Sequence, residues 1–271
     1  MLRCSFSSLY GNKEQRKGVR GVRRWVLPVA TLAALIGLWQ VAASSGALAD
    51  LLNVESFLAP SPAEIATALW ENRSLFAENA WVTLQEILLG FLCGLVLGLA
   101  FGFLLRPFEA LRLSFYPLIV GSQAIPIVVF APILVVWFGY GIGPKLVIVA
   151  LVCFFPIAVA TADGLRSVDP EATKTMRTLD ASRGQLLWRL EAPTALPFTF
   201  SGAKIGVTFA PIAAVFGEWA GANSGLGVLI REDSAHLATD RMFAAAFLLA
   251  AIALALYGLV ALAERRVVTW R

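Results

Sequence analysis

Few residues in this sequence have the types and spacing that chemistry at a site requires. The three cysteines, Cys4, Cys93 and Cys153, lie far apart, one in a basic tail and two in apolar runs. They give neither a disulfide framework nor metal-ligand spacing. The single histidine, His236, has no cysteine or histidine beside it, so no metal site is expected. A phosphate-cradling glycine pattern is also absent, so we do not expect the chain to hydrolyse nucleotide by itself.

One carboxylate, Glu218, lies within an apolar run. Ionisable groups buried in membranes are costly and usually face a pathway or a partner. Three roles stay open for Glu218: a pathway or gate residue, an interfacial carboxylate that reaches water, and a member of a packing ion pair. The candidate pathway or gate residues are Ser122, Gln123, Pro126, Glu218 and Trp219. For Ser122 and Gln123 the alternative is hydrogen bonding to carbonyls that a proline leaves free.

The composition is that of a membrane protein. Of 271 residues, 58% are hydrophobic and 15% are charged, and the mean hydropathy is +0.75. Soluble domains contain roughly a quarter charged residues. We predict an all-α protein with six transmembrane helices. Its expected parts are a basic cytoplasmic tail (1–24), a first transmembrane helix (25–43), an extracytoplasmic segment with a short interfacial helix (44–80), a core of five transmembrane helices (81–266) and a cytoplasmic C-terminus (267–271).

The apolar runs define the expected spans. They are Trp25–Ala43, Ile87–Leu105, Leu113–Tyr140, Lys145–Ala162, Gly202–Ala222 and Met242–Ala263. The third contains Pro117, Pro126 and Pro132, so kinked or non-helical backbone buried in the bundle is expected there. Before the second span, Ser61 and Glu64 form a capping box with Pro62 at the first helical position, which predicts the short interfacial helix.

Small residues mark a seam on the second span. Gly90, Gly94, Gly98 and Gly102 recur every four residues, so they lie on one helix face. Such a stripe lets another helix approach closely. We interpret it as a packing seam, either within the subunit or between two subunits.

The distribution of basic residues predicts the orientation. With the N-terminus inside, the tail and the inner loops carry 18 of the 22 Lys and Arg residues, seven of them in residues 1–24. This asymmetry follows the positive-inside rule, and both termini are therefore expected in the cytoplasm. The basic tail directly abuts an apolar span, so it is interpreted as topogenic rather than as a nucleic-acid-binding segment.

The polar loop 166–199 between the fourth and fifth spans has clear helix signals. Asp169 precedes Pro170 as an N-cap, and Ser182 forms a second capping box with Gln185. A second helical run is expected to end at Pro193. The loop either simply joins two spans or is a docking handle for a cytoplasmic partner. The candidate contact residues of this handle, Asp169–Pro193, are Met176, Leu179, Asp180, Ala181, Ser182, Arg183, Leu186, Leu187, Leu190 and Pro193.

The handle resembles the coupling motif in permease subunits of bacterial ABC importers. That motif reads Glu-Ala-Ala, three residues, Gly, nine residues, Ile, one residue, Leu-Pro. Aligned at Pro193, the glycine position falls on Asp180 and the isoleucine position on Leu190. The Glu-Ala-Ala positions hold Lys174-Thr175-Met176, so the spacing is kept while these letters are not.

The resemblance extends from Phe57 to the C-terminus. It includes Leu58-Ala59-Pro60-Ser61-Pro62, Trp137-Phe138-Gly139 and Gly217-Glu218-Trp219. These segments are similar to the nitrate, sulfonate and taurine branch of the importer permeases, and Gly217-Glu218-Trp219 is most like permeases for thiamine pyrimidine precursors. The resemblance implies a MetI-like type I importer fold in the bacterial inner membrane.

The same resemblance implies partners and a mechanism. Two ATP-binding subunits would dock on the handle, a solute-binding protein would deliver the solute outside, and a second, identical or similar permease would complete the pathway. The chain itself would hold no cofactor, and ATP with Mg²⁺ would bind the ATPases. Permeases for sulfonate, taurine, nitrate or riboflavin-like solutes are alternatives within the class. A secondary transporter or channel would need midplane ion sites, and a membrane enzyme would need convergent catalytic groups.

Overall fold

The computed structural model describes residues 11–106, 113–114, 116–118, 121 and 125–270, and all regular structure among them is helical. The chain divides into two compact units, Met1–Ala68 and Leu69–Arg271. Each unit is described by itself.

The first unit contains α1 (Gly11–Ser44), α2 (Ala47–Leu52), η1 (Ser56–Leu58) and most of α3 (Pro62–Glu71). The predicted capping box begins α3: the Ser61 amide donates to Glu64 Oε2 at 2.7 Å, and the Glu64 amide donates to Ser61 Oγ at 3.3 Å. The side chain of Gln40 accepts a hydrogen bond from the Ala63 amide at 2.9 Å, which fastens α3 to α1. A short helix is therefore present where the capping box predicts one.

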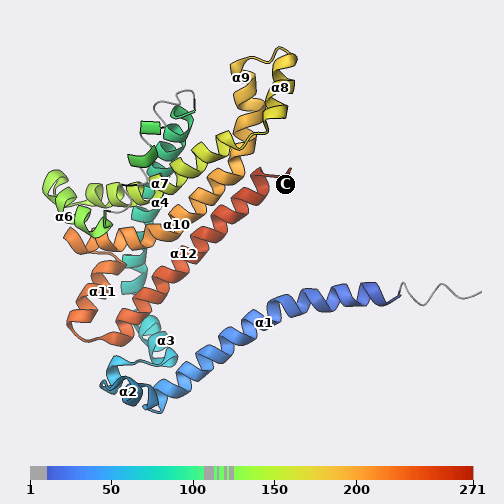
Figure 1. Cartoon of the computed structure of the whole chain (residues 1–271). Helices are drawn as coiled ribbons and strands as arrows, with labels where there is room; N and C mark the ends of the chain where they lie inside the picture. Colours follow the sequence, from blue (N-terminus) through green and yellow to red (C-terminus); the bar gives the residue numbers. More distant parts are fainter. Residues whose placement is uncertain (1–10, 107–112, 115, 119–120, 122–124, 271) are drawn as a thin grey trace, which may run out of the picture. The chain divides into compact units, whose positions relative to one another are not determined.

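The second unit is built around α7. Its elements are α4 (Arg73–Leu104), α6 (Ile127–Phe138), α7 (Ile142–Arg166), α8 (Pro170–Thr178), α9 (Arg183–Leu186), the π-helical turn η2 (Leu187–Glu191), α10 (Ala192–Gly221), α11 (Leu226–Ala235) and α12 (Thr239–Val267). The helix α7 packs against both α4 and α10, and α12 packs against α10 and α11. Figure 1 shows α8 and α9 projecting beyond one end of α7 and α10.

Five helical runs in the described part are long and apolar enough to cross a membrane: Val26–Ser44, Arg73–Leu104, Ile142–Arg166, Arg183–Gly221 and Thr239–Val267. Each corresponds to a span expected from the sequence. Several are longer than expected, because the helix continues through polar residues beyond its apolar part. The second span begins at Arg73 instead of Ile87, and the fifth is continuous with η2 and α9.

The expected third span, Leu113–Tyr140, is not one continuous helix. Pro126 is extended, with φ −60° and ψ 124°, and it precedes α6, which has only 12 residues. Proline disfavours a continuous helix because it lacks an amide hydrogen, but Pro132, also expected to disturb this span, lies inside α6. After α6, Gly139 and Gly141 have φ values of 75° and 148°, which glycine adopts readily, and they form the turn that precedes α7.

The glycine stripe of α4 lies against α7. Successive glycines oppose successive α7 residues: Gly90 with Val149, Gly94 with Cys153, Gly98 with Ile157 and Gly102 with Thr161. A Cβ on Gly94 would lie 2.7 Å from both Ala150 O and Cys153 Cβ, so no larger residue fits without movement. The partners advance by four residues on both helices, so α4 and α7 run in the same direction. The seam lies within this chain.

Candidate functional site

Local hydrogen bonds shape the first half of the handle. Asp169 caps α8 by accepting from the Glu171 amide at 2.9 Å. At the other end, the Ala181 amide donates to Met176 O and the Asp180 amide donates to Arg177 O. Asp180 has φ 54°. These bonds form a Schellman motif, in which a left-handed residue ends the helix. Asp180 thus occupies the conformation that glycine usually adopts, as its place in the motif predicts.

The second half of the handle differs from the expectation at Pro193. The predicted capping box is present: Gln185 N donates to Ser182 Oγ, and Ser182 N donates to Gln185 Oε1 at 2.8 Å. Pro193, however, does not end a helix, because η2 leads directly into α10 and Pro193 lies in the first turn of α10. A proline ring inside an α-helix clashes with the carbonyl four residues earlier. The turn just before Pro193 is the wider π-turn η2, and the chain continues from it into α10.

The handle exposes two large apolar side chains. Leu179 is 75% exposed and Trp188 is 70% exposed. Of the apolar residues predicted for contact, Leu186 is buried, whereas Leu187 and Leu190 are half-buried. The predicted set therefore contains one side chain that supports the handle from inside. Trp188, which the sequence reasoning missed, lies beside Leu187 on the π-turn.

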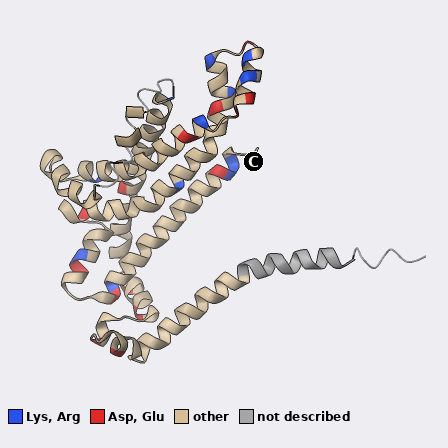
Figure 2. Cartoon of the chain, viewed as in Figure 1, with Lys and Arg blue, Asp and Glu red and all other residues tan. Residues whose placement is uncertain are grey.

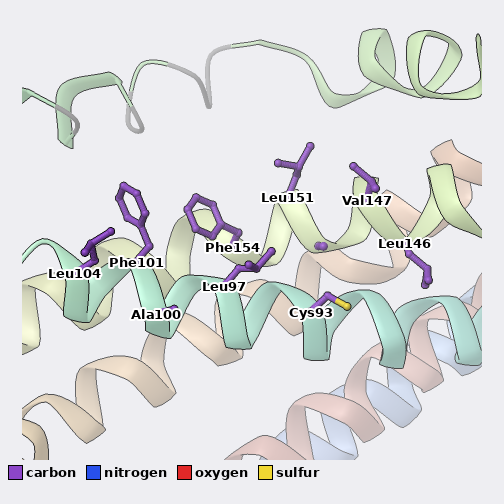
Figure 3. Close-up of a pocket in the computed structure, with 10 residues that line it drawn as sticks. Cys93, Leu97, Ala100, Phe101, Leu104, Leu146, Val147, Leu151 and Phe154 are labelled. Atoms are coloured by element: carbon purple, nitrogen blue, oxygen red, sulfur yellow. The ribbon is translucent and has the colours of Figure 1, made fainter. Parts of the chain in front are cut away.

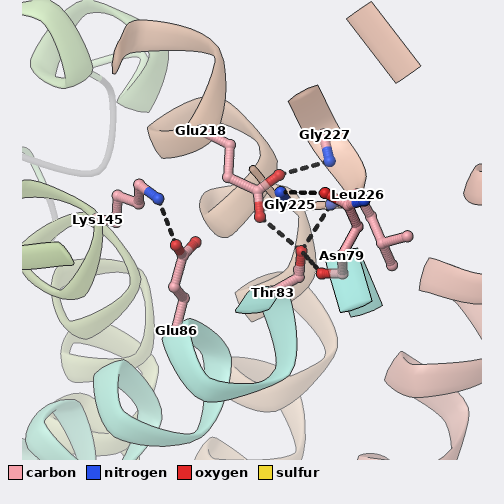
Figure 4. Close-up of polar contacts among 8 residues, drawn as sticks. All are labelled: Asn79, Thr83, Glu86, Lys145, Glu218, Gly225, Leu226 and Gly227. Atoms are coloured by element: carbon pink, nitrogen blue, oxygen red, sulfur yellow. Dashed lines mark hydrogen bonds and ion pairs between the residues drawn. The ribbon is translucent and has the colours of Figure 1, made fainter. Parts of the chain in front are cut away.

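Glu218 is at the centre of a buried cluster at the other end of α10 (Figure 4). The Thr83 hydroxyl donates to Glu218 Oε1 at 2.6 Å, and the Gly227 amide donates to Oε2 at 2.5 Å. Glu218 is 0% exposed, so the interfacial role in which it reaches water is wrong for this structure. Its partners lie on α4 and at the N-terminus of α11, where amide groups favour a carboxylate. Glu218 therefore joins three helices.

Two further contacts hold the start of α11 on α4. The Leu226 amide donates to Thr83 Oγ1 at 2.8 Å, and the Gly225 amide donates to Asn79 Oδ1 at 2.7 Å. Gly225 has φ 125°, and a Cβ on it would overlap the Glu218 carboxylate. The loop before α11 therefore needs glycine at this position for both its conformation and its space.

A buried ion pair adjoins the cluster. Lys145 Nζ on α7 lies 2.5 Å from Glu86 Oε1 on α4, and both side chains are buried. The Glu86 and Glu218 carboxyls interact electrostatically, and Figure 4 shows them on neighbouring helices. The sequence analysis placed Lys145 at the start of the fourth span and began the second span after Glu86, so it missed this pair.

A signal for the missed residues does exist in the sequence. Asn79, Thr83 and Glu86 precede Gly90 at spacings of four, three and four, so they continue the face of the glycine stripe. The structure confirms this continuity, because Thr83, Glu86 and the four glycines are all buried. One face of α4 thus carries both the polar cluster and the apolar seam.

The other residues assigned to a pathway have different environments. Trp219 is 43% exposed, and its indole Nε1 donates to Gly227 O at 2.8 Å. Pro126 borders an apolar groove of about 470 Å³ together with Ile205 and Phe209 of α10. Ser122 and Gln123 lie outside the described residues. Trp219 and Glu218 both bind the backbone of Gly227, but Glu218 is buried and Trp219 is partly exposed.

The described residues leave one face of α10 uncovered. Its exposed side chains are Phe198, Ser201, Ile205, Thr208, Phe209, Ile212 and Trp219. A second groove on this face, about 330 Å³ in volume, includes the hydroxyl-bearing Ser201, Thr208 and Tyr257. The face therefore mixes apolar side chains with a few polar groups, a combination that suits contact with a small solute.

A larger groove between α4 and α7 is apolar throughout (Figure 3). It measures about 770 Å³, and its lining includes Leu97, Phe101 and Phe154, with Cys93 among them. Its lining side chains offer no charged, hydroxyl or amide group to orient a polar solute. No group of three or more His, Cys, Asp or Glu residues that could hold a metal ion occurs among the described residues.

Comparisons with known proteins agree with this architecture. Residues 90–269 match the family model of the binding-protein-dependent transport system inner membrane component. A probable ABC transporter permease protein of Haemophilus influenzae is 37% identical, over 86% of this chain and 93% of its own length. The formylaminopyrimidine transport permease protein ThiX of Halalkalibacterium halodurans is 34% identical, over 90% and 95%. The riboflavin transport system permease protein RibX of Chloroflexus aurantiacus is 35% identical, over 93% and 94%.

Solved structures show the same fold at lower identity. A chain of the MetNI methionine ABC transporter in an inward-facing conformation superposes with a TM-score of 0.64 and 21% identity, covering 73% of this chain and 98% of that chain. A chain of an amino acid ABC transporter superposes with a TM-score of 0.58 and 17% identity, covering 74% and 97%.

Proposed function

The chain belongs to the family of binding-protein-dependent inner membrane transport components, the permeases of ABC importers, and from this premise we propose that it imports a thiamine pyrimidine precursor. It is a transport subunit without a catalytic site of its own. ATP hydrolysis by two partner subunits drives the uptake. A solute-binding protein outside the membrane delivers the solute and supplies most of the selectivity.

The family match from Gly90 to Thr269 carries this proposal. It spans the glycine seam, the handle and Glu218. The matches to the relatives of 34–37% identity extend over 93–95% of each relative's length, so the chain matches nearly the whole of each permease.

We propose that the six spans place both termini and the handle in the cytoplasm. Lys and Arg gather over α8, α9 and the C-terminal end of α12 (Figure 2). Lys204, near the handle end of α10, pairs with Glu264 of α12 at 2.8 Å, so these ends lie together. The positive-inside rule then assigns this common end to the cytoplasm.

A transport assay tests the energy source. The permease, its native ATPases and its binding protein are reconstituted in proteoliposomes. Solute uptake is expected only with ATP and Mg²⁺ on the handle side. Uptake that needs an ion gradient and no ATPase would identify a secondary transporter and sink the proposal.

The docking of the ATPases is tested at Leu179. This side chain is 75% exposed at the C-cap of α8, a helix with no buried residue, so Leu179→Glu should leave the fold intact and abolish copurification of the ATPase. The control is Leu237→Glu, because Leu237 is an exposed leucine in a loop away from the handle. Retention of the ATPase by Leu179→Glu would show that the docking surface lies elsewhere.

The substrate is proposed from the ThiX relative, and the RibX relative supports riboflavin as the alternative at similar identity. Sulfonate and taurine permeases match at lower identity, 27% and 29%. The binding protein that copurifies with the chain would be heated with formylaminopyrimidine, hydroxymethylpyrimidine, riboflavin and taurine in turn. A rise in unfolding temperature with a pyrimidine alone supports the proposal, and a rise with riboflavin or taurine replaces it.

We also propose that the uncovered face of α10 lines the pathway, opposite the same face of a second copy. Pro126 and Trp219 border this face, whereas Glu218 fixes the loop beside it and acts on a gate indirectly. In a cysteine-free background, a cysteine replacing Thr208 should react with a polar thiol reagent at rates that differ with and without ATP. A cysteine replacing Ala210, which is 0% exposed on the same helix, should not react.

A further inference from the structure

The handle is fastened to α4 as well as to α10. The rings of Phe103 and Trp188 stack, with centroids 6.4 Å apart and an interplanar angle of 29°. Two residues past the end of α4, the Arg106 guanidinium binds both carboxylate oxygens of Glu191, with Nη2 to Oε1 at 2.7 Å. Such two-point pairs are stronger and more directional than single hydrogen bonds. Both contacts reach η2, the π-turn at the root of the handle.

The opposite end of α4 is fastened to α10 through the Glu218 cluster. Thr83 bonds Glu218 directly, at 2.6 Å. From Thr83 to Phe103, α4 advances 20 residues, about 30 Å at 1.5 Å per residue, and the helix contains no proline. By contrast, α10 contains Pro197 and Pro211, and α7 contains Pro156. Of these three packed helices, α4 is therefore the one with an uninterrupted hydrogen-bond ladder.

These contacts close a ring. The helix α10 runs from the handle root to Glu218, and Glu218 bonds to Thr83 of α4. From there α4 runs back to the handle root, where Phe103 and Arg106 contact η2. We propose that α4 and α10 move together when the handle is pulled, and that the Arg106–Glu191 pair is the positioning contact that brings α4 along. This inference rests on the proposed function of the handle, since it concerns how that docking site reaches the outer end of the spans.

The test separates coupling from assembly. Glu191→Gln removes one charge from the pair and leaves the exposed docking surface unchanged. Glu264→Gln is the matched control, because Glu264 is 13% exposed against 12% for Glu191 and pairs with Lys204 of α10, so its substitution leaves the Arg106–Glu191 pair in place. For each complex in proteoliposomes, ATPase copurification, ATP hydrolysis stimulated by loaded binding protein, and uptake would be measured.

The expected result is that Glu191→Gln keeps the ATPase bound and lowers uptake per ATP at least tenfold, while Glu264→Gln changes this ratio less than twofold. The reversed pair, Arg106→Glu with Glu191→Arg, should restore at least a third of the lost ratio. An unchanged ratio in Glu191→Gln, an equal loss in Glu264→Gln, or loss of ATPase binding would each overturn the inference. Failure of the proposed function would instead appear in the unmodified complex, as uptake that does not depend on ATP.

Discussion

The handle and the Glu218 cluster lie at opposite ends of α10, and their structures depend on different ranges of the chain. The hydrogen bonds that form the Schellman motif at Asp180 and the capping box at Ser182 join residues at most five apart. The cluster depends on contacts across the fold, since Thr83 lies 135 residues from Glu218. Local bonds form the shape of a projecting segment, whereas distant bonds hold spans in place.

The two regions also differ in what they expose. The handle presents Leu179 and Trp188 to its surroundings, and α8 has no buried residue. The cluster is closed: Thr83, Glu86, Glu218 and Leu226 are at most 1% exposed. We therefore expect substitutions in the cluster to reduce stability, and substitutions in the handle to reduce coupling with little effect on global stability.

The largest effect is expected at Glu218. Glu218→Ala leaves the Thr83 hydroxyl and the Gly227 amide buried without their acceptor, which should lower the free energy of unfolding by about 3 kcal/mol. Thermal unfolding of the detergent-solubilised chain measures this. Glu232→Ala, which removes an exposed acid from α11, is the control and should change little. An unfolding temperature for Glu218→Ala equal to that of the control would show that the cluster does not hold the helices.

A somewhat smaller loss is expected at the seam that continues the cluster. In Gly94→Ala the new Cβ would meet Ala150 O and Cys153 Cβ at 2.7 Å, so α4 and α7 must separate, at a cost of about 2 kcal/mol. Gly258→Ala on α12 meets no atom within 4 Å, and it should be neutral or slightly stabilising. The same unfolding measurement compares the two. Equal stability would mean that the seam is not closely packed.

At the handle, a backbone substitution should act only locally. Asp180→Val places a β-branched residue at φ 54°, which should destabilise the turn by about 1.5 kcal/mol. Asp180→Gly should be tolerated or slightly stabilising. Amide hydrogen exchange in α8 should increase in the valine variant, while the unfolding temperature of the spans stays unchanged. A lower global unfolding temperature would contradict the difference drawn between the two regions.

The smallest effect is expected from the cap of α9. Ser182→Ala removes the acceptor of the Gln185 amide and should cost about 1 kcal/mol, again only within the handle. Ser182→Thr keeps a hydroxyl and should retain most of the protection. Exchange at the Gln185 amide measures the change directly. If alanine left that exchange rate unchanged, the capping box would not stabilise α9.

Local features of the fold were predictable to the extent that neighbouring residues produce them. The caps at Ser61, Asp169 and Ser182 were all recognised and are all present. Pro117, Pro126 and Pro132 predicted kinked or non-helical backbone in the third span; Pro126 lies just before α6, whereas Pro132 lies inside it. Pro193 was misread because a proline signal shows where an α-helix is difficult, and it does not show that a π-turn can lead into it.

The candidate site at Glu218 was predictable only in part. A carboxylate in an apolar run singled out Glu218, but its exposure and its partners on α4 and α11 depend on how the helices pack. Lys145 and Glu86 lie at the ends of apolar runs, where hydropathy marks a boundary. Their pairing follows from the parallel packing of α4 on α7, and a hydropathy profile gives no information about which helices pack together.

By itself, the sequence determined that the chain is a helical membrane protein with a capped polar handle and a glycine stripe, because composition, spacing and caps act over a few residues. Tertiary structure alone decided that the stripe faces α7, that Leu186 is buried while Leu179 and Trp188 are exposed, and that Glu218 joins α4 to α11. The physical reason is that a helix face acquires its environment only when another helix packs against it.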